Sequence, residues 1–186
     1  MKTTTRLLAA LVLSIGLAGG ALADVLAGNA PFLGASSGQQ SDANSATYSQ
    51  AFVAPANSTF EAIRWWGFHS ANSMGSAYDN FVVSLDGIAQ AGTLSVVDGT
   101  TFNEYTLTIT PVAGAFSQLS IVNNSFDVEW FWQSAAAQGN SAAPDASAVA
   151  FSLIGSVTPV PEPETVTLFL AGLAALALVK ARRTQT

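Results

Sequence analysis

The amino-acid sequence predicts an all-β protein whose central part is an antiparallel β-sandwich, jelly-roll-like, with about eight strands. Apolar and polar residues alternate over short segments between residues 48 and 153, as they do in strands that bury one face. Turn-forming dipeptides separate these segments, and residues 24–158 contain no convincing helical pattern. All four tryptophans, all three tyrosines and ten of the eleven phenylalanines also lie within residues 24–158.

The predicted elements follow one another at short spacing. Residues 28–47 are rich in glycine, alanine, serine, glutamine and asparagine, which predicts a loop or a frayed N-terminal segment. The predicted strands cover residues 48–53, 59–68, 81–85, 88–97, 105–110, 116–122, 128–133 and 149–153. Two Asp-Gly dipeptides, at residues 86–87 and 98–99, are typical of hairpin turns. The clearest alternation lies in residues 105–110, where three threonines separate the apolar positions.

The charge of the chain excludes several classes of function. Only 10% of the 186 residues are charged, and the formal net charge is −6. Residues 24–158 contain one arginine, no lysine and ten carboxylates, so this segment is strongly acidic. We expect no nucleic-acid partner, because such proteins need basic residues to meet phosphates. The absence of cysteine excludes disulfides, thiolate metal sites and cysteine nucleophiles.

The N-terminal residues have the pattern of an export signal. It begins with a basic part that contains Lys2 and Arg6, followed by an apolar part over residues 7–17. A cleavage signature of the form A-x-A, with Ala21 and Ala23, comes last. This order is typical of a secretory signal peptide that signal peptidase removes. The apolar run is shorter than the about 20 residues that span a bilayer. We therefore expect residues 1–23 to be absent from the mature, exported protein.

The C-terminal residues also form a tripartite segment. Its parts are a Pro161-Glu162-Pro163 motif, an apolar helix predicted over residues 166–179, and a basic end of Lys180, Arg182 and Arg183. A helix of that length reaches roughly 21 Å, which is short of a hydrocarbon core of about 30 Å. The basic end favours the cytoplasmic side of the membrane. The pattern predicts a weak membrane anchor that leaves residues 24–158 outside.

On these three parts the tail resembles the PEP-CTERM sorting signal of exopolysaccharide-producing Gram-negative bacteria. Thr165, Leu168, Gly172 and Leu173 match the usual positions of the helix in that family. The resemblance implies recognition by a membrane enzyme of the exosortase type. It also implies export across the inner membrane with transient anchoring there, cleavage near the Pro-Glu-Pro motif, and transfer to the cell surface or the extracellular matrix.

The central segment also resembles a β-sandwich domain that recurs in front of this tail. The resemblance rests on residues 63–67, 119–123, 130–132 and 150–153. It supports the fold far more than a function. We therefore expect three parts, namely a signal peptide (residues 1–23), a secreted β-sandwich domain (residues 24–158) and a sorting tail (residues 159–186).

The tryptophans are the candidate ligand-binding residues. Trp65 and Trp66 are neighbours in a predicted strand, so they point to opposite faces of the sheet, whereas Trp130 and Trp132 share one face. Large aromatic rings either fill a core or, when exposed, stack on sugar rings. Both alternatives remain open for these four residues.

The sequence offers no credible catalytic set. Residues 34–38 satisfy the G-x-S-x-G pattern of serine hydrolases, but no helix is predicted after them. His69 is the only histidine and has no identifiable catalytic partner, which favours a structural or surface role. Asp127 and Glu129 are expected to lie side by side rather than on opposite sides of a sugar, as a glycosidase requires.

Two carboxylates are candidate ligands of a structural calcium ion. Asp42 is followed by Asn44, and Asp79 is followed by Asn80, and Ca²⁺ takes oxygen ligands of these kinds. Solvated carboxylates are the alternative, and no other cofactor is expected. Arg64 is expected to form an ion pair with one of the carboxylates.

These observations predict a non-enzymatic structural or adhesive protein of the cell surface or matrix, associated with exopolysaccharide or a biofilm. One alternative is a carbohydrate-binding module that uses surface tryptophans. A weaker alternative is an enzyme that cleaves polysaccharide.

Overall fold

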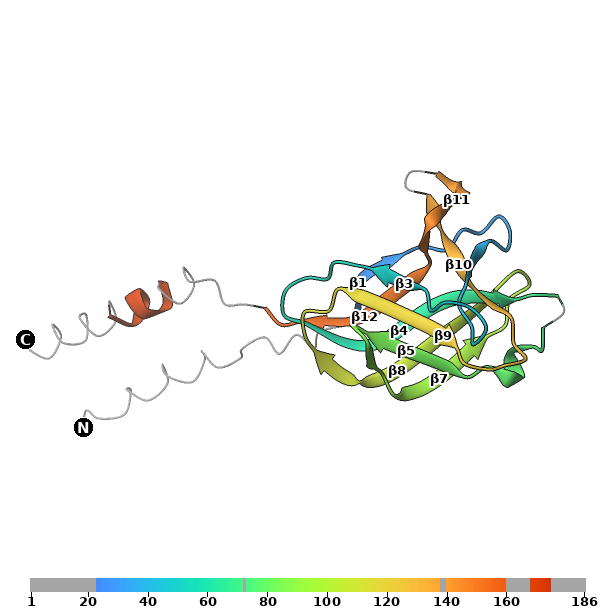
Figure 1. Cartoon of the computed structure of the whole chain (residues 1–186). Helices are drawn as coiled ribbons and strands as arrows, with labels where there is room; N and C mark the ends of the chain where they lie inside the picture. The colour runs from blue at the N-terminus through green and yellow to red at the C-terminus, as the bar shows by residue number, and fades with distance from the viewer. Residues whose placement is uncertain (1–22, 72, 138–139, 160–167, 175–186) are drawn as a thin grey trace, which may run out of the picture.

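The computed structural model describes residues 23–71, 73–137, 140–159 and 168–174. Two antiparallel β-sheets form a sandwich over residues 24–157, so the predicted antiparallel β-sandwich is confirmed (Figure 1). Residues 1–22 of the predicted signal peptide lie outside the described residues. A short 3₁₀ helix, η1 (Ser76–Tyr78), precedes β5.

The strands divide unequally between the two sheets. The large sheet contains β1 (Asp24–Asn29), β2 (Gly38–Gln40), β4 (Ser58–His69), β7 (Gly92–Val97), β8 (Asn103–Ala113), β10 (Trp130–Ala137), β11 (Asn140–Val149) and β12 (Phe151–Val157). The small sheet has the order β3 (Ser49–Ala51), β9 (Gln118–Asn123), β5 (Phe81–Leu85) and β6 (Ile88–Ala89).

The long strand β4 organises the large sheet. One side of β4 pairs with β8 from Thr59 to Gly67. The other side pairs with β12 along its first part and with β10 along its last three residues. Beyond these partners, β7 pairs with β8, β1 with β12, and β2 and β11 with β10. The buried residues Phe60, Ile63 and Trp65 of β4 belong to the core, while Arg64, Trp66 and Phe68 on the opposite face are only partly buried.

A cluster of aromatic rings fills the space between the sheets. Phe81 lies at its centre, with ring centroids 5.4 Å from Trp65, 4.8 Å from Tyr105 and 5.0 Å from Trp130. The rings of Trp65 and Tyr105 are stacked at 5.5 Å. These edge-to-face and stacked arrangements are favourable for aromatic pairs and add to the free energy of burial.

The predicted strands correspond to strands of the structure, with three additions. β1, β2 and β11 were not predicted, and the predicted loop over residues 28–47 is wrong at the end of β1 and at β2. The predicted strand 88–97 is divided into β6 and β7. β1 and β2 are edge strands whose partners, β12 and β10, are distant in sequence, so tertiary pairing rather than local composition creates them.

The two Asp-Gly signals differ in outcome. Asp86 and Gly87 have φ angles of 46° and 79°, as a two-residue turn between β5 and β6 requires. Residues 98–102 form a longer connection between β7 and β8. The amide of Gly99 there donates a hydrogen bond of 3.2 Å to the side-chain oxygen of Asn103.

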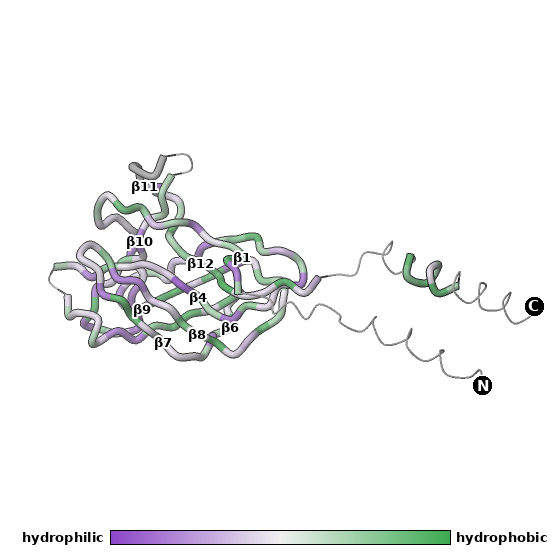
Figure 2. The backbone as a smooth tube through the Cα atoms, turned by 180° about the vertical axis from the view of Figure 1, so that it is seen from behind, coloured by the Kyte–Doolittle hydropathy of each residue, from purple (hydrophilic) through white to green (hydrophobic). Residues whose placement is uncertain are grey.

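The C-terminal tail is described only in part. Residues 168–174 are helical and mostly apolar, and Figure 2 contrasts them with the interleaved hydrophobic and hydrophilic residues of the strands. Among the described residues, no helix has the length and apolar character needed to cross a membrane. The remainder of the predicted helix over residues 166–179 lies outside the described residues.

Candidate functional site

The structure separates the four candidate tryptophans by the face of the sheet on which they lie. Trp65, Trp130 and Trp132 are each 0% exposed and belong to the core. The indole nitrogen of Trp132 donates a hydrogen bond of 2.8 Å to the carbonyl oxygen of Ala150. These three residues are therefore not placed to bind a ligand at the surface. Trp66 is only partly buried and lies on the outer face of β4.

Trp66 shares the outer face with two phenylalanines. Phe68 lies two residues further along β4, and Phe131 of β10 lies opposite Phe68 in the strand pairing. The rings of Phe68 and Phe131 are stacked, with centroids 5.2 Å apart and planes inclined by 7°. All three residues are partly buried. We call Trp66, Phe68 and Phe131 the aromatic strip.

A polar group fixes the tryptophan at one end of the aromatic strip. Glu104 of β8 lies opposite Trp66, and its Oε2 accepts a hydrogen bond of 3.1 Å from the indole nitrogen. The other carboxylate oxygen, Oε1, lies 3.3 Å from Nε of Arg64. The predicted ion pair of Arg64 is thus confirmed, although the contact is an ion pair rather than an aligned hydrogen bond. Glu104 holds both an aromatic plane and a cation in fixed positions.

The strip was only partly recognised in the sequence. Phe68, Phe131 and Glu104 were not among the candidate residues. The alternation of Arg64, Trp66 and Phe68 along one strand places them on one face. The same rule places Phe131 on the face opposite to Trp130 and Trp132. Strand pairing, which brings β4, β8 and β10 together, was the missing information.

His69 belongs to a buried polar cluster rather than to an open site. Its Nε2 lies 2.8 Å from Oδ1 of Asp79, which also accepts a hydrogen bond of 2.6 Å from Asn123. The hydroxyl of Tyr105 donates to Oδ2 of Asp79 at 3.1 Å. Burial, together with the Asp79 charge, raises the pKa of the Tyr105 hydroxyl, which keeps it a donor. The cluster joins β4, β8 and β9 and fits a structural role for His69.

The two candidate calcium ligands are engaged with protein donors. Asp42 is 1% exposed, and its carboxylate accepts hydrogen bonds from the side chain of Gln40 and from the amides of Asn44 and Trp130. Asp79 is engaged as described above. The part of the chain that the structure describes contains no group of three or more His, Cys, Asp or Glu residues arranged to hold a metal ion.

The remaining acidic candidates line a hollow, and the serine candidate lies in a loop. Asp127 and Glu129 precede β10 and line a hollow of about 270 Å³ together with Asp42. Ser36, the serine of the G-x-S-x-G pattern, lies between β1 and β2, where its hydroxyl donates to the carbonyl oxygen of Thr101 at 2.8 Å. The strand-to-helix elbow that this motif needs is not formed there.

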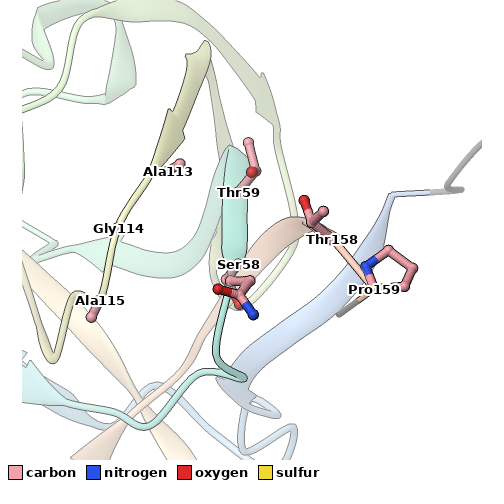
Figure 3. A pocket seen from close by; sticks show the side chains of 8 residues that line it. Ser58, Thr59, Ala113, Gly114, Ala115, Thr158 and Pro159 are labelled. Carbon is pink, nitrogen blue, oxygen red and sulfur yellow. The ribbon is translucent and has the colours of Figure 1, made fainter. Parts of the chain in front are cut away.

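A second hollow lies where the domain leads into the tail (Figure 3). Its volume is about 650 Å³. It is surrounded by the start of β4 and by the ends of β8 and β12. The described residues that line it are uncharged: Asn57, Ser58, Thr59, Ala113, Gly114, Ala115, Thr158 and Pro159. Such a lining provides hydroxyl and backbone groups but no acid or base among these residues.

Comparison with known proteins identifies the tail. Residues 159–183 match the family described as the PEP-CTERM protein-sorting motif, which confirms the resemblance found in the sequence. No curated protein and no solved structure matches the chain. Most residues of the motif, including Pro161–Pro163 and the basic end, lie outside the described residues. The motif implies an exported protein that an exosortase-type enzyme sorts to the cell surface.

Proposed function

Because the chain carries a PEP-CTERM sorting motif, we propose that it is a non-enzymatic component of the cell surface or extracellular matrix that holds polysaccharide on its aromatic strip. The observation that carries this proposal is the position of Trp66. Its ring remains partly exposed on the outer face of β4, beside the stacked pair of Phe68 and Phe131. A flat indole face such as that of Trp66 packs against the apolar face of a sugar ring.

The setting of Trp66 supports a binding role over a purely structural one. Glu104 orients the indole, so little conformational freedom is lost when a ligand binds. Arg64 and Glu104 are 39% and 34% exposed, so they remain available to sugar hydroxyl groups beside the ring. The strip runs along β4, and a polymer lying along that strand contacts Trp66 and Phe68 in turn.

The charge of the domain favours a neutral polysaccharide. Residues 24–158 contain ten carboxylates and one arginine, and that arginine is paired with Glu104. An acidic polymer is repelled by such a surface unless divalent cations lie between them. We expect binding of a neutral polymer to be insensitive to a chelator and binding of an acidic polymer to require Ca²⁺.

A non-enzymatic role is supported by the arrangement of the titratable groups. His69 is held by Asp79, and Asp42, which lines the hollow beside Asp127 and Glu129, already accepts hydrogen bonds from protein donors. The most direct check is incubation of the exported protein with the polysaccharide that it binds. Stable polymer length is expected, and the appearance of oligosaccharides would contradict the proposal.

Affinity electrophoresis through polysaccharide-containing gels tests the binding role. Trp66→Ala should lose most of the retardation that the unaltered protein shows. Phe126→Ala is the matched control, because Phe126 is 80% exposed but lies outside the strip. Equal retardation of both variants would contradict a binding role for the strip. Loss of retardation in Phe126→Ala alone would place binding elsewhere.

We also propose that the sorting enzyme cleaves near Pro161–Pro163 after a stage of membrane anchoring. A Pro161→Ala, Glu162→Ala, Pro163→Ala triple variant should then accumulate in the membrane fraction at full length. A Thr184→Ala, Gln185→Ala variant, altered beyond the matched residues 159–183, is the control. Unchanged processing and release of the triple variant would refute this step.

A further inference from the structure

β7 forms one edge of the large sheet, and its outer side pairs with no other strand among the described residues. The strand runs for six residues, Gly92–Val97, and all six are exposed. An edge strand of this length presents unpaired backbone donors and acceptors to which another strand can add. We call this unpaired side of β7 the free edge.

The free edge exposes side chains that belong to the core face of the sheet. Leu94 lies opposite Leu107, and Val96 lies opposite Tyr105, so all four project from the same face. Leu107 is 8% exposed and Tyr105 is 0% exposed, whereas Leu94 is 38% and Val96 39% exposed. The sandwich therefore stays open along β7, because the small sheet does not cover its inner face.

The small sheet also has an exposed apolar side chain on its inner face, at its edge strand β6. Ile88 of β6 lies opposite Leu85, which is fully buried, yet Ile88 itself is 61% exposed. Apolar side chains are thus exposed at the rims of both sheets, and apolar side chains that gather at a protein surface mark interaction surfaces.

The other edge strands carry features that discourage pairing. A bulge between Val25 and Ala27 interrupts β1. β11 contains Pro144 and Asp145. The strands β2, β3 and β6 have no more than three residues each. Bulges, proline, charge and short length all protect sheet edges, but residues 87–97 contain neither a charged residue nor a proline.

The uncharged residues of the free edge allow a second copy of the chain to approach it. Two copies of this domain repel each other where their acidic surfaces meet, because residues 24–158 hold ten carboxylates against one arginine. Residues 87–97 are uncharged, so two copies that meet at β7 bring no carboxylates together within the strand pair. A second copy of this chain can therefore pair with the free edge without placing carboxylates opposite one another in the paired strands.

We infer that two copies of the chain associate by antiparallel pairing of β7 with β7, about a two-fold axis that is perpendicular to the sheet and passes midway between the two opposite Ser95 residues. In this register Leu94 lies opposite the partner's Val96, and the reciprocal contact follows by symmetry. Asp98 lies opposite the partner's Gly92 and not opposite another carboxylate. A register centred on Leu94 places Val96 opposite glycine, so the axis at Ser95 covers more apolar surface.

The paired sheet would place both aromatic strips on one face of the dimer. A two-fold axis perpendicular to the sheet leaves each outer face on the same side. A polymer that contacts both strips is held with an avidity above that of one strip. This consequence rests on the proposed function, whereas the association through β7 does not.

Cysteine substitution in the cysteine-free chain tests the register. Directly opposite residues of an antiparallel pair have Cα atoms about 4.5–5.5 Å apart, within the range of about 4.4–6.8 Å that a disulfide spans. Ser95→Cys in the full-length exported chain should therefore give a disulfide-linked dimer on a non-reducing gel. Thr108→Cys on the neighbouring β8 is the control, because its symmetry mate lies three strand spacings away, at least roughly 14 Å. Equal dimer formation by both variants, or a link from Ser95→Cys to a different protein, would overturn the inference.

A pair of valines tests the association without a new covalent bond. Val96 and Val82 are 39% and 38% exposed, but Val82 lies on β5, away from the free edge. Val96→Lys should weaken self-association by at least about tenfold in sedimentation equilibrium, and Val82→Lys should leave it unchanged. Matching circular dichroism spectra establish that both variants are folded. A monomeric unaltered protein, or equal association of both variants, would refute pairing through β7.

Discussion

Trp65 and Trp66 are neighbours in β4, yet Trp65 is completely buried while Trp66 keeps part of its ring exposed. The difference follows from strand geometry, which sends adjacent side chains to opposite faces of a sheet. On the inner face aromatic rings pack against the small sheet. On the outer face no element of similar size covers the rings of the aromatic strip among the described residues. The comparison teaches that the same residue type is completely buried on one face of a strand and stays partly exposed on the other, which is the face of the proposed binding site.

The largest loss of stability is expected on the inner face. Trp132→Ala removes a fully buried ring and its hydrogen bond to Ala150, and should lower the free energy of unfolding by about 3–5 kcal/mol. Trp66→Ala removes a partly exposed ring and one hydrogen bond, and should cost about 1 kcal/mol. Chemical denaturation of both variants measures the difference. Equal losses would break the distinction between the two faces.

The buried polar cluster should give the next largest effect. Asp79→Ala leaves His69, Tyr105 and Asn123 without their shared acceptor. An unpaired buried polar group costs about 1–3 kcal/mol, so the melting temperature should fall clearly. Asp127→Ala, at an exposed position, should change stability by no more than about 0.5 kcal/mol. Similar melting temperatures for the two variants would show that the cluster does not join the sheets.

Alkaline pH should weaken the inner face selectively. Burial raises the pKa of Tyr105 above its ordinary value of 10.0, so the neutral hydroxyl is favoured in the folded state. This contribution is complete below that ordinary value and is lost as the pH rises toward the raised pKa of the folded state. Stability should therefore decline above about pH 10, and Tyr105→Phe should decline less steeply. Parallel pH profiles would contradict this assignment.

Glu104→Ala on the outer face is expected to change stability only slightly. This substitution releases both the indole of Trp66 and the guanidinium of Arg64, but all three side chains are partly exposed. Stability should change by no more than about 1 kcal/mol, while affinity for polysaccharide should fall by about tenfold. Glu129→Ala, an exposed carboxylate away from the strip, is the control for titration calorimetry. An unchanged affinity would show that Glu104 does not position the indole of Trp66 for binding.

Alternation in the sequence predicts the sandwich and the separation of Trp65 from Trp66, because both depend only on the two-residue period of a strand. It does not predict β2, whose Gly38-Gln39-Gln40 sequence becomes a strand only by pairing with β10. The pairing of Phe68 with Phe131 on neighbouring strands cannot be predicted from the sequence either, because it depends on the register between strands that are distant in the chain. The sorting tail is recognisable because its three parts are contiguous.

The candidate carboxylates illustrate the same limit. Asp42 and Asp79 resemble calcium ligands in sequence, because each lies near an asparagine. In the fold their oxygens accept hydrogen bonds from groups as distant in sequence as Trp130 and Asn123. Tertiary contacts decide whether a carboxylate is free to bind, and local sequence does not report those contacts.

Tryptophan fluorescence quenching tests the central claim most directly. Acrylamide should quench the exposed ring of Trp66, while the three buried tryptophans are protected. Saturating matrix polysaccharide should remove this quenchable component, which Trp66→Phe should lack from the start. A quenchable component that persists unchanged with polysaccharide bound would contradict the claim that the aromatic strip holds the polymer.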